Sequence, residues 1–316
     1  MMNDTVMDRF YDVEIAKSLL RAYIVQANQE VAQCPTIDNL EVDKATIAKF
    51  RYPRTWRMLS GSDEEEVNVR VVGIICRKDL PPFRSFTEHL KLSEKHRLRQ
   101  HVKLTGLGLD EFHEGFARVG EVAKVFDARM RRMESGNRYD VLQDMETATW
   151  EGNPVLDLHN RYFSYRTQVP DEKDLPFSQD VDPNHALEDA KGNELVHVGD
   201  NVVVYLKKRT TTEGEIKYTK TTPDNFHIGD IVEATMSFVA FPHGPPGKIG
   251  SHRLKLVLRA LALVNTEEAD KRRHENKMAA RLHHAPRVSL KRKKICYDSS
   301  DEEGRDSKTM RMDASF

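Results

Sequence analysis

Basic side chains interleaved with aromatic residues are the first feature of this 316-residue sequence that indicates chemistry. They recur on segments of the C-terminal half that we expect to be strands. Small barrels that bind single-stranded nucleic acid combine a cationic groove with aromatic rings on which bases stack. Exposed strands also carry lysine simply to stay soluble and to block edge pairing, so plain packing or protein interaction remains an alternative. The candidate nucleic-acid contacts are Lys207, Lys208, Arg209, Lys217, Tyr218, Arg253, Lys255 and Arg259.

A second cationic cluster lies near the C-terminus. Four consecutive cations occur there, and Lys271-Arg272-Arg273 stands upstream of them. Such clusters are bound by import receptors and by phosphate backbones. We therefore expect a nuclear protein with an importin-type receptor as a partner, against the alternative of a solvated charge run. The predicted import residues are Lys291, Arg292, Lys293 and Lys294.

Two serines follow this cluster in an acidic context. Ser299 and Ser300 precede Asp301-Glu302-Glu303, a pattern that acidophilic kinases favour. Each phosphate would add about −1.5 to −2 charges beside the basic cluster. We predict that both serines are phosphorylated and that the added charge opposes import or nucleic-acid contact; an unmodified polar tail is the alternative.

Signatures of catalysis are not found in the sequence. It contains no Gly-x-Ser-x-Gly, His-Glu-x-x-His or Walker loop, and Gly106-Leu107-Gly108 lacks the third glycine of a dinucleotide fingerprint. Cys34, Cys76 and Cys296 are too scattered for a disulfide framework or a zinc site. We expect a protein that is not an enzyme and uses no cofactor or metal. An enzyme with a site assembled from distant residues remains an alternative.

The composition indicates a folded core beside solvated segments. Hydrophobic residues make up 39%, charged residues 31%, and the net charge is −1. This near-neutral total conceals a basic arm, because residues 271–294 contain ten lysines and arginines and one glutamate. No apolar run approaches the roughly 18 residues that span a bilayer, so we expect no membrane insertion.

The elements that would position these residues change in type along the chain. Apolar spacing predicts helices over residues 8–33 and 109–134, with shorter helical segments at 44–50 and 83–103. A β-branched run predicts a strand over 67–76. Residues 151–196 are expected to be loop-rich, with a possible short strand at 162–165.

The C-terminal half is expected to be β-rich. Strands are predicted at residues 202–206, 216–219, 231–241 and 252–264, followed by a charged helix over 266–282. Several strands joined by Gly/Pro turns indicate a small antiparallel barrel or sandwich. We predict an α+β protein with a mainly helical region over 1–150, a β-rich domain over 151–265 and a charged helix with a disordered basic tail over 266–316.

Three segments carry a family resemblance. Asn225-Phe226-His227-Ile228-Gly229-Asp230-Ile231-Val232-Glu233, Met236-Ser237-Phe238-Val239-Ala240-Phe241-Pro242 and the run from His252 to Leu263 resemble an uncharacterised protein family of mushroom-forming fungi. The resemblance covers roughly residues 180–265. No activity is assigned to that family, so the resemblance implies no functional residues. The leading hypothesis is a non-catalytic nuclear protein that binds single-stranded nucleic acid, and the alternative is a nuclear protein–protein adaptor.

Overall fold

The computed structural model of the chain describes residues 9–30, 32–61, 65–86, 90–133, 140–145, 147–211, 215–244 and 250–283. Met1–Lys277 forms one compact unit and Met278–Phe316 a second, of which residues 278–283 are described. The predicted import cluster at 291–294 and the serines Ser299 and Ser300 lie outside the described residues, so both remain predictions.

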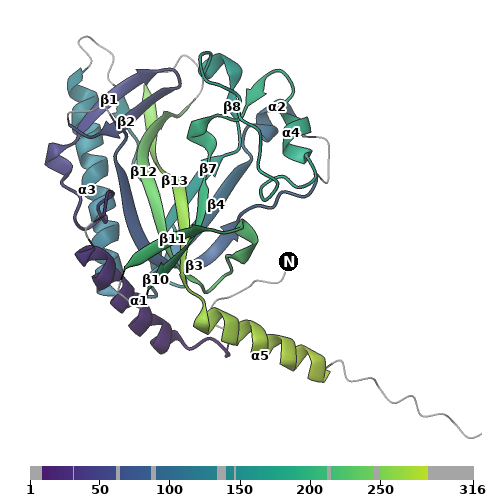
Figure 1. Cartoon of the computed structure of the whole chain (residues 1–316). Helices are drawn as coiled ribbons and strands as arrows, with labels where there is room; N and C mark the ends of the chain where they lie inside the picture. The colour runs from purple at the N-terminus through teal and green to yellow at the C-terminus, as the bar shows by residue number, and fades with distance from the viewer. Residues whose placement is uncertain are drawn as a thin grey trace, which may run out of the picture. The chain divides into compact units, whose positions relative to one another are not determined.

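A large mixed sheet is the centre of the first unit (Figure 1). Five of its strands pair in a closed ring, because the last of them pairs with the first. Four of the five pairings are antiparallel, and that between β7 and β13 is parallel. In ring order the strands are β3 (Asn68–Asp79), β4 (Arg99–Thr105), β7 (Asn153–Arg161), β13 (Ser251–Asn265) and β12 (Ile231–Pro242).

Two hairpins extend the ring. The first consists of β1 (Thr46–Arg51) and β2 (Arg54–Leu59), and β2 pairs with β12. The second consists of β10 (Val204–Thr210) and β11 (Ile216–Lys220), and β10 pairs in parallel with the second half of β13. Short strands complete the set: β5 (Val141–Leu142), β6 (Thr149–Trp150), β8 (Ser164–Tyr165) and β9 (Leu195–Val196).

Helices α1 (Val13–Gln29) and α3 (Asp110–Met133) lie along the same side of the sheet in Figure 1, and they contact each other. The Asp12 carboxylate caps α1 by accepting hydrogen bonds from the backbone N–H groups of Glu14 and Ile15. The other helices are α2 (Leu92–Lys95), α4 (Ala186–Lys191) and α5 (Glu267–His283), with 3₁₀ turns at Val42–Lys44, Arg166–Gln168, Gly199–Asn201 and Pro223–Asn225. No helix in the described part of the chain is long and apolar enough to cross a membrane.

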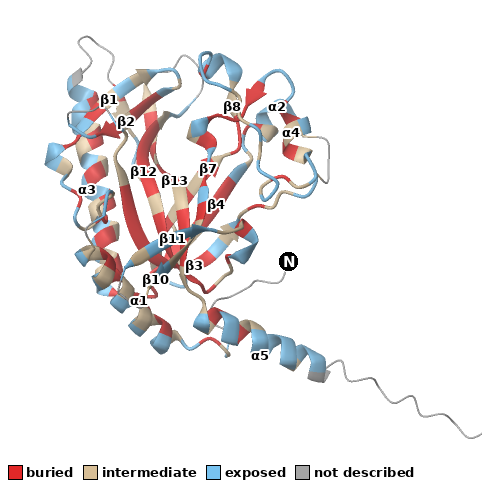
Figure 2. Cartoon of the chain, in the orientation of Figure 1, coloured by how far each residue is buried: buried red, intermediate tan, exposed pale blue. Residues whose placement is uncertain are grey.

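The core fills the inside of the ring and the space beneath the two long helices. Figure 2 shows buried residues running along the ring strands, whereas β11 is largely exposed. Leu104, Leu158 and Phe238 are fully buried, and Phe126 reaches the same core from α3. Because side chains alternate along a strand, burying one face of β4 and β7 leaves the other face free for polar residues.

The α+β class is confirmed, as are the helices expected at 8–33, 109–134 and 266–282 and the strands expected at 67–76, 216–219, 231–241 and 252–264. Three local predictions are wrong. Residues 46–51 form β1 instead of a helical segment, residues 99–105 form β4 after the four-residue helix α2, and the expected loop region contains β7. Strands from both sides of residue 150 pair in this sheet, so the predicted boundary there falls inside it.

Candidate functional site

A groove of about 720 Å³ lies where the first residues of β4 and β13 meet the last residues of β7 and β12. Residues 51–55, at the turn of the first hairpin, form one side of its lining. Asp200 and Asn201, from the 3₁₀ turn before β10, line it as well. The lining therefore comes from segments as far apart in sequence as Arg51 and Val257.

The outward face of β4 and β7 supplies the polar part of the groove. The register places Arg99 opposite Arg161 and His101 opposite His159. Of the intervening residues, Val102 and Leu158 are fully buried in the core, whereas Asn160 also lines the groove. Because strand residues alternate between faces, every second residue of these two strands is directed to the outside.

Positive charge dominates the lining. Among the described residues that line the groove, Asp200 is the single carboxylate, and it already accepts two hydrogen bonds from Arg57 at 3.0 and 2.8 Å. Arg259 donates to the same carboxylate at 2.8 Å. A polyanion entering the groove would therefore meet cations that outnumber the acid. The lining cations are Arg51, Arg54, Arg97, Arg99, Arg161, Arg253 and Lys255.

Arg161 lies half-buried at the centre of this charge. Burial lowers the pKa of its guanidinium group, and the neighbouring charges of Arg99 and Arg97 lower this pKa further. Its Nη1 lies 3.2 Å from His96 Nε2, and its guanidinium carbon lies 5.8 Å from the centre of the Phe241 ring. Within the described chain, no carboxylate forms an ion pair with Arg97, Arg99 or Arg161.

Two other cations, buried Arg70 and half-buried Lys208, have carboxylate partners. Arg70 contacts Glu30 at 2.9 Å and Glu233 at 3.2 Å, and Lys208 contacts both glutamates at 2.8 Å. An uncompensated charge in a partly buried site is destabilising unless a counter-charge arrives. The chain neutralises Arg70 and Lys208 internally, whereas half-buried Arg161 and the exposed Arg97 and Arg99 beside it have no carboxylate partner among the described residues.

Aromatic side chains lie in the same groove at different depths. The Tyr52 side chain is 54% exposed, Phe241 is half-buried, and Phe163 is fully buried and cannot contact a ligand with its ring face. The His96 ring stacks on Tyr165 with centroids 4.0 Å apart. Tyr52 and Phe241 therefore are the rings of this set that remain available for stacking.

Two histidines of the groove are held in the neutral form. Burial lowers the pKa of His96 to about 4, and the positive charges of Arg161 and Arg97 act in the same direction. Burial also lowers the pKa of His159; the nearby Asp157 opposes that shift, whereas the charges of Arg99 and Lys255 reinforce it. An anion bound beside either ring would favour its protonation.

A second hollow, of about 440 Å³, adjoins the groove. It shares Arg97 and Arg99 with the groove lining and adds Arg84 and Phe83 from the segment between β3 and β4, together with one carboxylate, Asp79. Cationic surface thus continues past the two shared arginines, which suits an extended anionic chain better than a single small anion.

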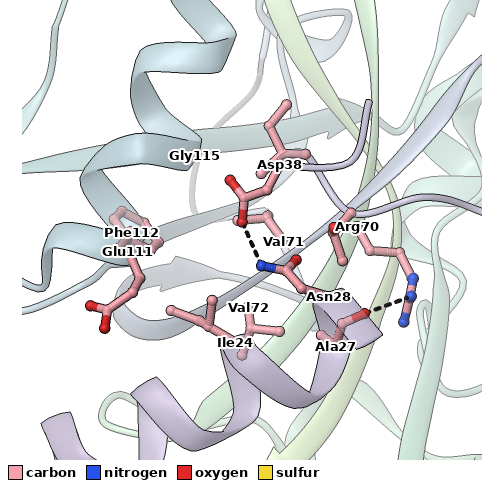
Figure 3. A pocket seen from close by; sticks show the side chains of 12 residues that line it. Ile24, Ala27, Asn28, Asp38, Arg70, Val71, Val72, Glu111, Phe112 and Gly115 are labelled. Atoms are coloured by element: carbon pink, nitrogen blue, oxygen red, sulfur yellow. Dashed lines mark hydrogen bonds between the residues drawn. The ribbon is translucent and has the colours of Figure 1, made fainter. Parts of the chain in front are cut away.

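The small cavity in Figure 3 is of a different kind. It lies between α1, α3 and β3, and its volume of about 20 Å³ suffices for roughly one water molecule. Asn28 donates to Asp38 at 2.9 Å across it, and Arg70 donates to the Ala27 carbonyl at 3.3 Å. This cavity belongs to the packing of α1 against the sheet.

The described side chains offer little reactive chemistry. No three histidine, cysteine, aspartate or glutamate side chains of the described residues gather as metal ligands. Cys76 is buried, and burial raises the pKa of its thiol to about 12. A thiol with so high a pKa is a poor nucleophile at neutral pH.

The structure separates the eight residues that the sequence singled out as nucleic-acid contacts. Arg253 and Lys255 line the groove. Arg259 pairs with Glu66 and Asp200 beside it. The remaining five lie on the β10–β11 hairpin, which pairs with the other half of β13; they are Lys207, Lys208, Arg209, Lys217 and Tyr218.

Two of those hairpin residues serve a buried ion cluster. Lys208 contacts Glu30 and Glu233, and the Tyr218 hydroxyl donates to Glu233 at 2.9 Å. Sequence reasoning missed Arg99 and Arg161 because β4 and β7 were not predicted, and it missed Arg97, which lies in the turn before β4. A partial signal was present: Val102 and Leu104 alternate with His101 and Lys103, and Leu156 and Leu158 alternate with Asp157 and His159.

Comparisons with known proteins give a weak structural likeness. No protein-family model and no curated protein matches the chain. Among solved structures, it is similar to gp2.5, a single-stranded DNA binding protein encoded by bacteriophage T7. The sequence identity is 14%, the TM-score is 0.33, and the match covers 63% of this chain and 86% of that chain. At these values the likeness establishes neither a shared fold nor a shared ligand.

Proposed function

We propose that the protein binds single-stranded nucleic acid, without catalysis, in the groove formed by β4, β7, β12 and β13. The observation that carries this proposal is the arginine set Arg97, Arg99 and Arg161, which lacks carboxylate partners among the described residues. The set lies in the same groove as the exposed Tyr52 ring and the half-buried Phe241 ring. Guanidinium groups match phosphate oxygens in geometry and charge. Phosphates of a bound strand would supply the missing counter-charge.

The strand pairing supports the same ligand class. We infer that the closed ring is a five-stranded barrel of the kind that binds oligonucleotides or oligosaccharides. Such barrels bind on the face of their second and third strands and on the loops after the first and fourth. In chain order the second and third of the five strands are β4 and β7. Arg97 lies in the segment after the first strand, β3, and His243 follows the fourth, β12. The strong positive charge favours an oligonucleotide over an uncharged saccharide.

The aromatic rings favour a single strand over a duplex. Base faces are hidden inside a double helix, whereas a single strand presents each base for stacking. Tyr52 and Phe241 would stack on bases while the arginines contact the backbone. Every base has such a face, so we propose binding that tolerates different sequences.

We also propose that the protein acts in the nucleus. The cations Lys291, Arg292, Lys293 and Lys294 support binding by an importin-type receptor. The same cations would add sequence-independent affinity for nucleic acid, and phosphate on Ser299 or Ser300 would reduce it.

Fluorescence anisotropy of a labelled single-stranded oligonucleotide tests the proposed function. We expect the full-length chain to bind with an affinity that falls steeply as salt rises, and replacement of Arg99 and Arg161 by glutamine to weaken binding at every salt concentration. Equal binding by the wild type and this variant would show that the groove is not the binding site. No binding by the wild type would leave the nuclear adaptor as the better hypothesis.

A further inference from the structure

The β1–β2 hairpin is not part of the five-stranded ring, yet its turn lines the groove. β2 joins the ring through its pairing with β12, in which Arg57 lies opposite Val239 and Trp56 opposite Ala240. The turn carries Arg51, Tyr52 and Arg54 into the groove lining. Because the hairpin contributes two arginines and one aromatic ring to the groove, it is placed to contact a ligand bound there.

The base of the hairpin is fixed on one side by a buried aromatic anchor. Trp56 is fully buried, and its Nε1 donates to Asp140 Oδ2 at 3.0 Å. Lys49 of β1 contacts the same oxygen at 2.8 Å, and its ammonium group lies 5.2 Å from the centre of the Trp56 ring. Both strands of the hairpin are thus held by one carboxylate.

The other side of the base is fixed to the floor of the groove. Arg57 donates through two nitrogens to the Asp200 carboxylate and through Nη1 to Glu66 at 2.9 Å. Arg259 of β13 binds the same two carboxylates. Two cations and two anions balance each other here, so the cluster fixes the hairpin and leaves the cations of its turn for a ligand.

The turn itself is exposed. Tyr52 is 54% exposed, and the Arg51 guanidinium lies 5.3 Å from the centre of its ring. Of the large hydrophobic side chains that are exposed in the described chain, Tyr52 is the one in the groove lining. No carboxylate in the described residues forms an ion pair with Arg51 or Arg54.

We propose that this hairpin is a preformed wall of the strand-binding groove, in which the Tyr52 ring stacks on one unpaired base and Arg51 and Arg54 bind the flanking phosphates. The proposal rests on the proposed function and adds a specific stacking residue to it. A fixed wall costs little ordering entropy when the strand binds, because its base is already held in place. Stacking of this kind requires an unpaired base and does not select among bases.

The test compares Tyr52→Ala with Tyr52→Phe in the full-length chain. A labelled oligothymidylate is one ligand, and a strand of equal length made of abasic sites is the other, with the same phosphates but no bases. We expect Tyr52→Ala to raise Kd for the oligothymidylate about 5- to 150-fold, the range for loss of one stacked base. Tyr52→Phe should bind like the wild type, because it retains a ring.

The abasic strand separates stacking from structural damage. We expect Tyr52→Ala to bind it as the wild type does, and the salt dependence of oligothymidylate binding to stay unchanged. The double variant Arg51→Gln with Arg54→Gln should weaken binding to both strands and make the salt slope shallower by about 1.4.

Three results would overturn the proposal. If Tyr52→Ala binds oligothymidylate with wild-type affinity, Tyr52 does not stack on a base, and the proposed function is unaffected. An equal loss for the abasic strand would show that Tyr52 acts through the shape of the hairpin and not by stacking. Failure of the wild type to bind oligothymidylate would refute the proposed function, and this inference with it.

Discussion

Replacing Arg97 and Arg99 together by glutamine should weaken binding without destabilising the fold. Seven cations line the groove. If each contacts a phosphate, the slope of log K against log salt for a single strand is about −5, since each contact contributes about −0.7. A fourfold rise in salt then lowers the affinity about 1,000-fold for the wild type. Loss of two contacts makes the slope about −3.5, and the same rise costs about 130-fold.

In contrast to the affinity, the thermal stability of the free protein should not fall in this variant. Arg97 and Arg99 repel Arg161, whose pKa they lower, so their removal relieves a like-charge contact. We expect the thermal midpoint of the variant to equal or exceed that of the wild type. A fall in both affinity and thermal midpoint would mean that the arginines hold the fold and would contradict their assignment to the ligand.

The matched control is Arg209→Gln with Lys217→Gln. It removes the same charge from the β10–β11 hairpin, where both side chains are exposed. Anisotropy titrations at several salt concentrations should give the wild-type slope within error. If this variant flattens the slope and the Arg97/Arg99 variant does not, nucleic acid binds on the hairpin, as the sequence first indicated, and the groove assignment is refuted.

Three further outcomes follow from buried charges. Affinity should rise as the pH falls from about 8 to about 5.5, because a bound phosphate raises the lowered pKa of His159, and His159→Gln should flatten this profile in titrations at each pH. Glu233→Gln should lower the free energy of unfolding by about 3–5 kcal/mol in urea denaturation, since it leaves Arg70 and Lys208 short of a counter-charge; an effect under 1 kcal/mol would contradict the importance of this cluster. Burial raises the pKa of Asp230 to about 6 from an ordinary value near 3.8, so its contribution to stability is present at low pH and is lost as the pH rises through about 6. Asp230→Asn should remove that loss, worth up to about 3 kcal/mol, and identical pH–stability curves for variant and wild type would count against it.

Elements with a strong local period were predictable from the sequence. Helix α3 carries an apolar stripe that includes Phe112, Val119, Val122, Phe126 and Met130, and β12 and β13 are long and β-branched or leucine-rich. β4 and β7 were missed because their outward positions carry long charged side chains and histidines, which obscure the alternation. The ring buries the apolar residues of both strands, such as Leu156 and Leu158 of β7.

The groove could be predicted only in part, because long-range pairing assembles it. Arg253 and Lys255 were identified from their own strand, but Arg51, Arg99 and Arg161 reach them only through the order in which the strands pair. Lys208 shows the converse problem. Its sequence context suggested a ligand contact, but Glu30, which lies 178 residues earlier in the chain, neutralises it.

Photo-crosslinking of an oligothymidylate to the full-length protein, with the attachment sites identified by mass spectrometry, tests most directly whether the groove is the binding site. We expect crosslinks in residues 51–55, 96–99, 159–164 and 241–243, the segments that line it. Crosslinks confined to the β10–β11 hairpin or to residues 284–316 would contradict the assignment of binding to the groove.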